Sequence, residues 1–219
     1  MVYLMLLSLA QAPPTPPPGG CVLEGVVSLK KDGQRVAPTG VVVYLKDGPP
    51  RARPEPETHF IKQKNLKFTP NVLVVLLNDR VTFTNEEDDT QTHSVFSRMG
   101  VDPFLGEVNK RATTFSRTFA KEGPVHIQCN VHQEMNADVL VLRSAAFTRP
   151  DAEGKWRITG LERKAYTLMV WEPNGAEERR EVAACATGPM VIDLMKQIPV
   201  KPLRRDGTRY RPEYQDAMW

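Results

Sequence analysis

The stretch that decides the fold of this chain is CNVHQEM at positions 129–135, in which Cys129, His132 and Met135 stand three residues apart. A thiolate, imidazoles and a weak axial thioether are donors that suit copper in both of its oxidation states. The loop carries three such groups, so a fourth must come from elsewhere, and His93 on an upstream strand-like segment is the candidate. The sequence therefore predicts a metal site with the ligands His93, Cys129, His132 and Met135.

The segments on either side of this loop have the pattern of β-strands. Residues 125–128 (VHIQ) precede it and residues 137–142 (ADVLVL) follow it, so the loop is expected to join two strands of a β-sandwich. His126 lies three residues before Cys129, where strand alternation turns it to the opposite face. We expect neither His126 nor His59 to bind the metal.

At these residues the chain resembles the cupredoxins, the blue-copper electron-transfer proteins, and the short Cys-x2-His-x2-Met loop is most similar to that of amicyanin. The resemblance runs from about residue 59 to residue 142. It includes QKNLKF at 63–68, an expected hairpin over 72–84 around Asn78-Asp79, and THSVFS at 92–97. It implies one type 1 copper ion that cycles between Cu(II) and Cu(I).

The same resemblance implies roles for residues around the metal. In many cupredoxins an Asn follows the first His ligand and braces the ligand loop; Ser94 stands there in this chain, and its hydroxyl is expected to serve. His132 is expected near the surface, where a redox protein partner docks, with Phe96 and Phe104 as candidates for the docking patch. The acidic run EEDD at 86–89 is expected to be a solvated loop or, alternatively, a patch that steers a cationic partner.

Two segments far apart in sequence have the features of a second, smaller domain. Strand-like residues 22–29 and 41–45 flank a turn-rich connection, and DAEG at 151–154 is a hairpin signal that precedes a further strand at 166–171. Together they resemble the carboxypeptidase regulatory-like, transthyretin-type β-sandwich, although Ala165 replaces the glycine of that family. The whole chain is similar to bacterial plastocyanin-like proteins with methylamine-utilisation names, which pair the two modules.

These resemblances imply an all-β chain, with a Greek-key cupredoxin sandwich inserted in, or fused to, the regulatory-like sandwich. The expected layout is a signal peptide and Pro-rich leader over 1–20, first regulatory-like strands over 21–50, the cupredoxin over 56–143, the remaining regulatory-like strands over 145–195, and an extended tail over 196–219. In the alternative layout, residues 22–45 are the first strands of the cupredoxin. The tail is expected to be a peripheral segment without chemistry that wraps the sandwich or lies disordered, with Tyr214 and Trp219 as candidate anchors.

Three cysteines and the N-terminus favour an exported protein. Once Cys129 is assigned to the metal, Cys21 and Cys185 remain, and an exported protein would tend to pair them. Leu4 to Leu9 form a short apolar core followed by Ala-Gln-Ala, which fits a signal peptide and is too short to span a bilayer. The periplasm or secretion is therefore expected, with acylation of Cys21 as a minor alternative that would give a weak membrane tether.

The remaining classes of function are limited by charge and chemistry. The net charge of +3 is small and its positive charges are scattered, so no nucleic-acid partner is expected. A copper-storage or cell-surface binding module stays open as an alternative to the electron carrier. An enzyme with Cys129 as nucleophile beside His132 or His126 would need an oxyanion site at a cleft. The loop offers none, and we expect no enzymatic activity.

Overall fold

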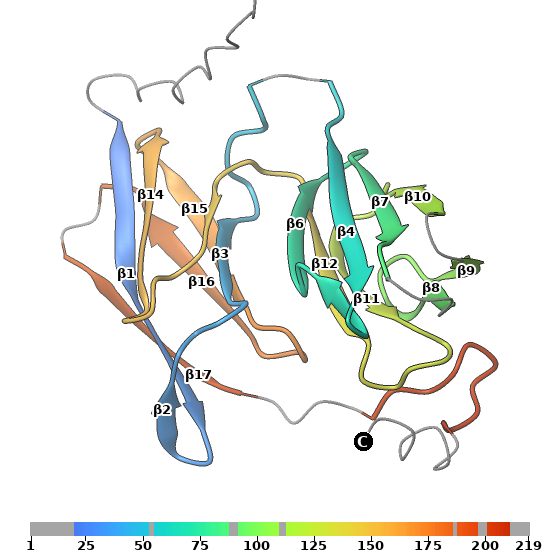
Figure 1. Ribbon diagram of the computed structural model, residues 1–219. Helices are drawn as coiled ribbons and strands as arrows, with labels where there is room; N and C mark the ends of the chain where they lie inside the picture. Colours follow the sequence, from blue (N-terminus) through green and yellow to red (C-terminus); the bar gives the residue numbers. More distant parts are fainter. Residues whose placement is uncertain are drawn as a thin grey trace, which may run out of the picture.

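Four β-sheets make up the computed structural model, which describes residues 20–52, 55–87, 92–109, 113–185, 188–196 and 201–210. These residues contain strands and no helix, so none of them forms a helix that could cross a membrane. The sheets lie in layers, two to a sandwich (Figure 1). The expected all-β architecture is confirmed.

The first sandwich is built from the two ends of the chain. Sheet A has the strand order β14-β1-β17 with β2 added to β1, and sheet B has the order β13-β3-β15-β16. Residues that alternate along β1, such as Leu23, Val27 and Leu29, fill the core between the sheets. The strands of sheet A are β1 (Cys21–Lys31), β2 (Gln34–Val36), β14 (Lys155–Leu161) and β17 (Met190–Met195), and those of sheet B are β3 (Val42–Leu45), β13 (Phe147–Thr148), β15 (Ala165–Trp171) and β16 (Glu177–Ala183).

The second sandwich contains the strands between residues 58 and 142. Sheet C has the order β10-β7-β4-β5 and sheet D the order β6-β12-β11-β8-β9. Phe83, Ile127 and Val139 are fully buried in the core between them. The strands of sheet C are β4 (Thr58–Lys64), β5 (Lys67–Thr69), β7 (Arg80–Asn85) and β10 (Thr114–Thr118), and those of sheet D are β6 (Val72–Leu76), β8 (His93–Gly100), β9 (Phe104–Asn109), β11 (Gly123–Gln128) and β12 (Asn136–Leu142).

Strand pairing assigns each part of the sequence to one of the two sandwiches. β1 pairs with β14 and β17, and β3 pairs with β13 and β15, so the first strands of the chain join strands that begin at residue 147 or later. Among the described residues, β1, β2 and β3 pair with no strand between residues 58 and 142. β11 and β12, the two strands predicted to flank the loop at 129–135, are antiparallel neighbours.

The sandwiches pack against each other through sheets B and D, which gives the layer order A-B-D-C (Figure 1). Each of the four strands at this contact is buried on both faces. Such strands are continuously apolar rather than alternating, which explains the runs Val41-Val42-Val43 and Val72 to Leu77 in the sequence. The side chains between the two sheets are Val42, Tyr44, Val72, Val74, Leu140, Leu142, Met169 and Trp171.

Two expected hairpins are wrong, although both turns exist. The backbone turns at Asn78 with φ +69°, but β6 lies in sheet D and β7 in sheet C. The turn at 151–154 ends on Gly154 with φ +86°, but β13 lies in sheet B and β14 in sheet A. Turn residues fix a local reversal of the chain, whereas the burial of each strand's face decides its partner. Both turns carry the chain across a core.

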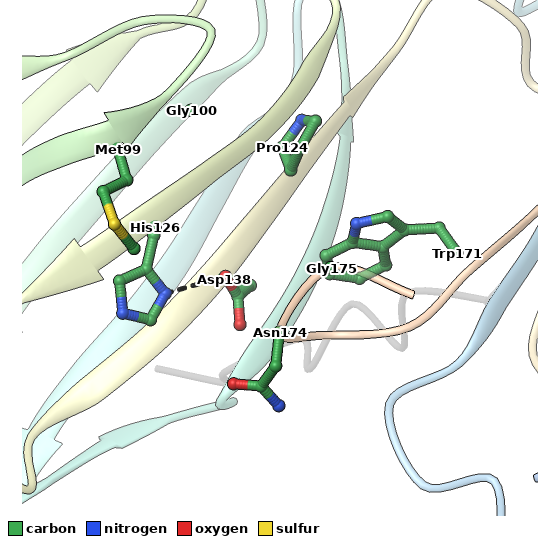
Figure 2. A pocket seen from close by; sticks show the side chains of 8 residues that line it. All are labelled: Met99, Gly100, Pro124, His126, Asp138, Trp171, Asn174 and Gly175. Atoms are coloured by element: carbon green, nitrogen blue, oxygen red, sulfur yellow. Dashed lines mark hydrogen bonds and ion pairs between the residues drawn. The ribbon is translucent and has the colours of Figure 1, made fainter. Parts of the chain in front are cut away.

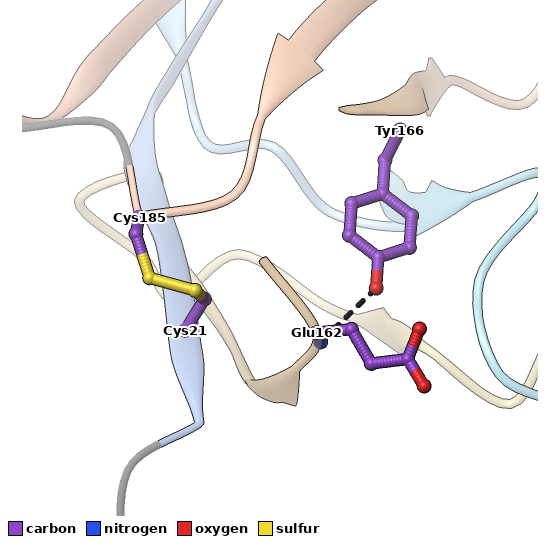
Figure 3. The surroundings of a disulfide bond; sticks show 4 residues. All are labelled: Cys21, Glu162, Tyr166 and Cys185. Carbon is purple, nitrogen blue, oxygen red and sulfur yellow. Dashed lines mark hydrogen bonds between the residues drawn. A yellow bond between two sulfur atoms is a disulfide. The ribbon is translucent and has the colours of Figure 1, made fainter. Parts of the chain in front are cut away.

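A disulfide joins Cys21 to Cys185, as expected, across 164 residues of sequence (Figure 3). Cys21 begins β1 of sheet A, and Cys185 follows β16 of sheet B. The bond therefore ties the two sheets of the first sandwich together near one end. The hydroxyl of Tyr166 accepts a hydrogen bond from the Glu162 backbone N–H nearby, at 3.1 Å.

Some expected features fall outside the described residues: the signal peptide and leader up to residue 19, Asp88 and Asp89 of the acidic run, and Tyr214 and Trp219 of the tail. The tail is described over 201–210, where every residue is exposed or partly buried. Tyr210 and Arg205 form hydrogen bonds with the loop that carries Cys129.

Candidate metal centre

The structure brings His93, Cys129 and His132 together at one end of sheet D. His93 is the first residue of β8, and Cys129 comes directly after β11. The two histidines face each other with 3.1 Å between their Nδ1 atoms, and the Cys129 Sγ lies 3.8 Å from the His132 Nδ1. Among the described residues this is the one group of three such side chains whose donor atoms all lie within 4.8 Å of one another.

These distances fit a single transition-metal ion. A ligand nitrogen or sulfur lies about 2.0–2.3 Å from such an ion, so two ligand atoms can be at most about 4.5 Å apart. The spacings of 3.1 and 3.8 Å satisfy this limit. Two imidazoles and one thiolate are also the donor set that copper accepts in a trigonal site. The residues present therefore fit a copper ion.

Met135, the fourth predicted ligand, is 1% exposed and packs in the same core cluster as Cys129. The loop closes on itself at this residue. The Cys129 N–H donates to the Met135 carbonyl at 3.1 Å, and the Met135 N–H donates to the His132 carbonyl at 3.2 Å. These two bonds hold the Cys, His and Met positions in one compact turn between β11 and β12.

Glu87 contacts this cluster through His93, and the sequence did not reveal that contact. Its carboxylate lies 2.9 Å from the His93 Nε2 and accepts the backbone N–H groups of Asn65 and Leu66, each at 3.0 Å. The expectation that the acidic run is solvated is wrong at Glu87, which is 8% exposed. Glu86 of the same run is bonded to Lys62 at 3.1 Å. A carboxylate on the outer nitrogen of a ligand histidine fixes its tautomer and orientation.

Ser94 lies where the bracing residue was expected. Its hydroxyl accepts the Asn130 N–H at 2.6 Å and lies 4.0 Å from the Cys129 Sγ. Ser94 follows His93 on β8, whereas Asn130 follows Cys129, so one hydroxyl connects the two parts of the chain that supply the clustered side chains. Its side chain is buried, which keeps water away from both bonds.

The electrostatics of the cluster favour a thiolate. Burial raises the pKa of Cys129, but hydrogen bonds with His132, His93 and the backbone outweigh burial and bring the pKa down to about 5. Burial lowers the pKa of His93, but the Cys129 thiolate and the Glu87 carboxylate raise it above its ordinary value. The cysteine is thus ionised at neutral pH, which is the form that binds metals.

The surface around His132 differs from the expected docking patch. Phe96 and Phe104 were candidates for that patch, but they are 0% and 8% exposed and belong to the interior. The Phe104 ring is covered by the Arg117 guanidinium, 4.5 Å from the ring centre. The exposed apolar side chain next to it is Leu105, and His132 itself is partly exposed.

The other two histidines lie apart from the cluster. His59 is bonded to Asp79 at 3.1 Å, and His126 is bonded to its cross-strand neighbour Asp138 at 2.9 Å. The His126–Asp138 pair lines a cavity of about 200 Å³ between sheet D and the turn after β15 (Figure 2). This cavity is also lined by Met99 and Trp171, and none of the three clustered ligands borders it.

Comparisons with protein-family models and with curated proteins found no match to this chain. Solved structures of copper proteins do match part of it. A copper-containing nitrite reductase from Thermus scotoductus is 23% identical over 42% of this chain and 25% of its own, with a TM-score of 0.38. A purple cupredoxin from Nitrosopumilus maritimus is 19% identical over 38% of this chain and 98% of its own, with a TM-score of 0.35.

A reduced proline-to-phenylalanine variant of amicyanin is 24% identical over 45% of this chain and 97% of its own, with a TM-score of 0.36. The neighbours are thus cupredoxin-type proteins. The chain spans nearly all of the two small cupredoxins and about a quarter of the nitrite reductase. Each of these matches covers less than half of this chain, with a TM-score below 0.4.

Proposed function

We propose that this protein is a type 1 copper electron carrier whose single copper ion is held by His93, Cys129, His132 and Met135. The observation that supports this most is the approach of two imidazole nitrogens and a thiolate sulfur within 4.8 Å of one another. Copper bound there supplies one-electron chemistry between Cu(II) and Cu(I). The electron carrier is proposed without enzymatic activity of its own.

The protein's part is to keep these ligands still while the charge of the site changes. His93 is anchored by Glu87, and the peptide that follows Cys129 is anchored by Ser94. Both anchors come from residues that are at most 8% exposed. A ligand set that is fixed in this way rearranges little on oxidation or reduction. Met135 is proposed as the weak axial ligand, which tunes the reduction potential.

The test is the visible spectrum and the voltammetry of the copper-loaded protein. An electron carrier gives an intense thiolate-to-copper band and a reversible one-electron wave. We expect Cys129→Ser to abolish the band, and Met135→Leu to keep it while raising the potential, because Cu(II) loses a donor. His126→Ala, outside the cluster, is the matched control and should leave both unchanged. Tight Cu(I) binding with neither signal would instead support the storage or cell-surface alternative.

The remaining elements of the proposal concern location and partners. The disulfide of the first sandwich favours an oxidising compartment, and so supports export to the periplasm or outside the cell. We infer that this sandwich is a regulatory-like module, because its strands come from both sides of the 58–142 segment. A redox protein partner is proposed to dock near His132, with no nucleic acid involved.

A further inference from the structure

The C-terminal segment 201–210 lies across the loop between β11 and β12, far from the sheets that precede it in sequence (Figure 1). It has a defined shape of its own. The Gly207 N–H donates to the Arg204 carbonyl, and the Arg204 N–H donates to the Thr208 carbonyl, both at 2.8 Å. Gly207 has φ +87°, a backbone conformation that suits glycine, so the turn is built into the sequence.

This turn is fixed to sheet D next to the metal loop. The Arg98 Nη1 on β8 donates to the Arg205 carbonyl at 2.6 Å. The Arg205 N–H in turn donates to the Asn130 Oδ1 at 2.7 Å, so the side chain that follows Cys129 is held from outside. These bonds place the next residues of the tail, up to Tyr210, over the ligand loop.

Tyr210 completes the contact with the metal loop. Its hydroxyl donates a hydrogen bond to the carbonyl oxygen of Cys129. The N–H of the same peptide group belongs to Asn130 and donates to the Ser94 hydroxyl. The peptide between Cys129 and Asn130 is therefore held at both polar atoms, by β8 on one side and by the tail on the other.

Holding both ends of a peptide group prevents its rotation. A fixed peptide plane restrains the ψ angle of Cys129 and holds the start of the metal loop between β8 and the tail, and the sulfur is attached to this restrained backbone. We propose that Tyr210 is a positioning residue of the metal centre, which acts with Ser94 to fix the Cys129 sulfur. As far as copper is concerned, this inference rests on the proposed function.

The test compares Tyr210→Phe with Tyr166→Phe in the full chain. Both variants remove one tyrosine hydroxyl that is bonded to a backbone group, but Tyr166 lies in the first sandwich. Cys129 is the one free thiol, because the other two cysteines form the disulfide. The rate at which a thiol reagent modifies the native apoprotein therefore reports on this loop alone.

We expect Tyr210→Phe to speed this modification by about 2- to 10-fold, since loss of one hydrogen bond shifts a local opening equilibrium by that factor. Tyr166→Phe should not change it. In copper-loaded protein, Tyr210→Phe should also shift the thiolate-to-copper band, which a merely structural role would not do. Asn130→Ala, which removes the contact with Arg205, should act in the same direction.

Equal modification rates and equal spectra for Tyr210→Phe and the unchanged protein would overturn the assignment. A thermal unfolding curve for each variant separates a local effect from loss of the fold. The two proposals fail separately. If copper gives no intense band with the unchanged protein, the electron carrier is excluded, while the thiol measurement on apoprotein still decides whether Tyr210 positions Cys129.

Discussion

At the scale of single residues, the most informative contact is the one between His93 and Glu87. The carboxylate is held by the N–H groups of Asn65 and Leu66, which have φ values of +52° and +57° in the turn between β4 and β5. A left-handed leucine costs on the order of 1 kcal/mol. The turn adopts this conformation despite its cost, and two of its N–H groups donate to the Glu87 carboxylate. A turn in sheet C therefore orients a histidine in sheet D.

Burial raises the pKa of Glu87, but the hydrogen bonds from Leu66, His93 and Asn65 lower it below its ordinary value. Glu87→Gln removes the charge, and we expect it to weaken copper binding by about 10- to 100-fold, because the histidine ligand loses its anchor. Glu86→Gln changes the exposed neighbour and should leave affinity unaltered. Competition with a chelator of known affinity measures both; identical values for the two variants would contradict the role of Glu87.

At the scale of elements, the decisive feature is the connection between β6 and β7, which carries the chain from sheet D to sheet C. Asp79 is buried there and accepts the N–H groups of Glu57 and Leu76, both at 2.8 Å. It also forms an ion pair with Arg51 and a hydrogen bond with His59. One carboxylate thus ties the start of sheet C to the end of β6.

We expect Asp79→Asn to lower the free energy of unfolding by about 2–4 kcal/mol, since a buried ion pair loses its charge and donors lose acceptors. The exposed pair of Lys30 and Asp193 offers a control: Asp193→Asn should cost less than about 1 kcal/mol. Denaturant unfolding at neutral pH measures both. A loss of unfolding free energy for Asp79→Asn as small as that of the control would contradict this prediction.

Asp79 also makes the free energy of unfolding depend on pH, and the direction of its pKa shift fixes the sign. Burial raises the pKa of Asp79, but hydrogen bonds from Glu57, Leu76, Arg51 and His59 outweigh it, so the pKa in the folded state is lowered. Its stabilisation is therefore complete above the unfolded-state pKa of about 3.9 and is lost as pH falls through the lower folded-state value. The stability difference between Asp79→Asn and the unchanged protein should shrink below about pH 4.

At the scale of the whole molecule, the contact between sheets B and D joins the two sandwiches. A buried carboxylate beside this contact lowers the stability of the fold. Glu172 directly follows β15 beside this contact, and its side chain is 1% exposed. Its carboxylate lies 3.7 Å from the Lys196 Nζ, which is beyond hydrogen-bond distance. Burial raises the pKa of Glu172, and the nearby Lys196 only partly offsets this.

We expect Glu172→Gln to raise the free energy of unfolding at neutral pH by about 1 kcal/mol, because it removes a poorly compensated buried charge. With a raised folded-state pKa, the glutamate form is most stable below its unfolded-state pKa of about 4.3 and loses stability as pH rises. The gain should therefore vanish in acid. Glu178→Gln, in an exposed pair with Arg180, should show no such trend; a neutral or negative effect of Glu172→Gln at pH 7 would contradict the prediction.

The sequence by itself determined what depends on neighbours along the chain. The spacing of Cys129, His132 and Met135 puts three donors in one turn, and the apolar runs on both sides make the strands that hold it. The cysteine count left Cys21 and Cys185 as the pair that forms the disulfide. The all-β class followed from the same local patterns, because strand and turn propensities act over a few residues.

Only the tertiary structure decided what depends on contacts between distant segments. The partners of β6, β7, β13 and β14 were missed because a turn fixes a reversal and not the sheet that receives the strand. β17 was missed because its two inward residues, Ile192 and Leu194, give a weak pattern beside the exposed Val191 and Met195. Glu87 and Tyr210 are ordinary polar residues in sequence. Folding buries Glu87 against His93 and brings the Tyr210 hydroxyl to the Cys129 carbonyl. Contacts between segments so far apart in sequence leave no local pattern.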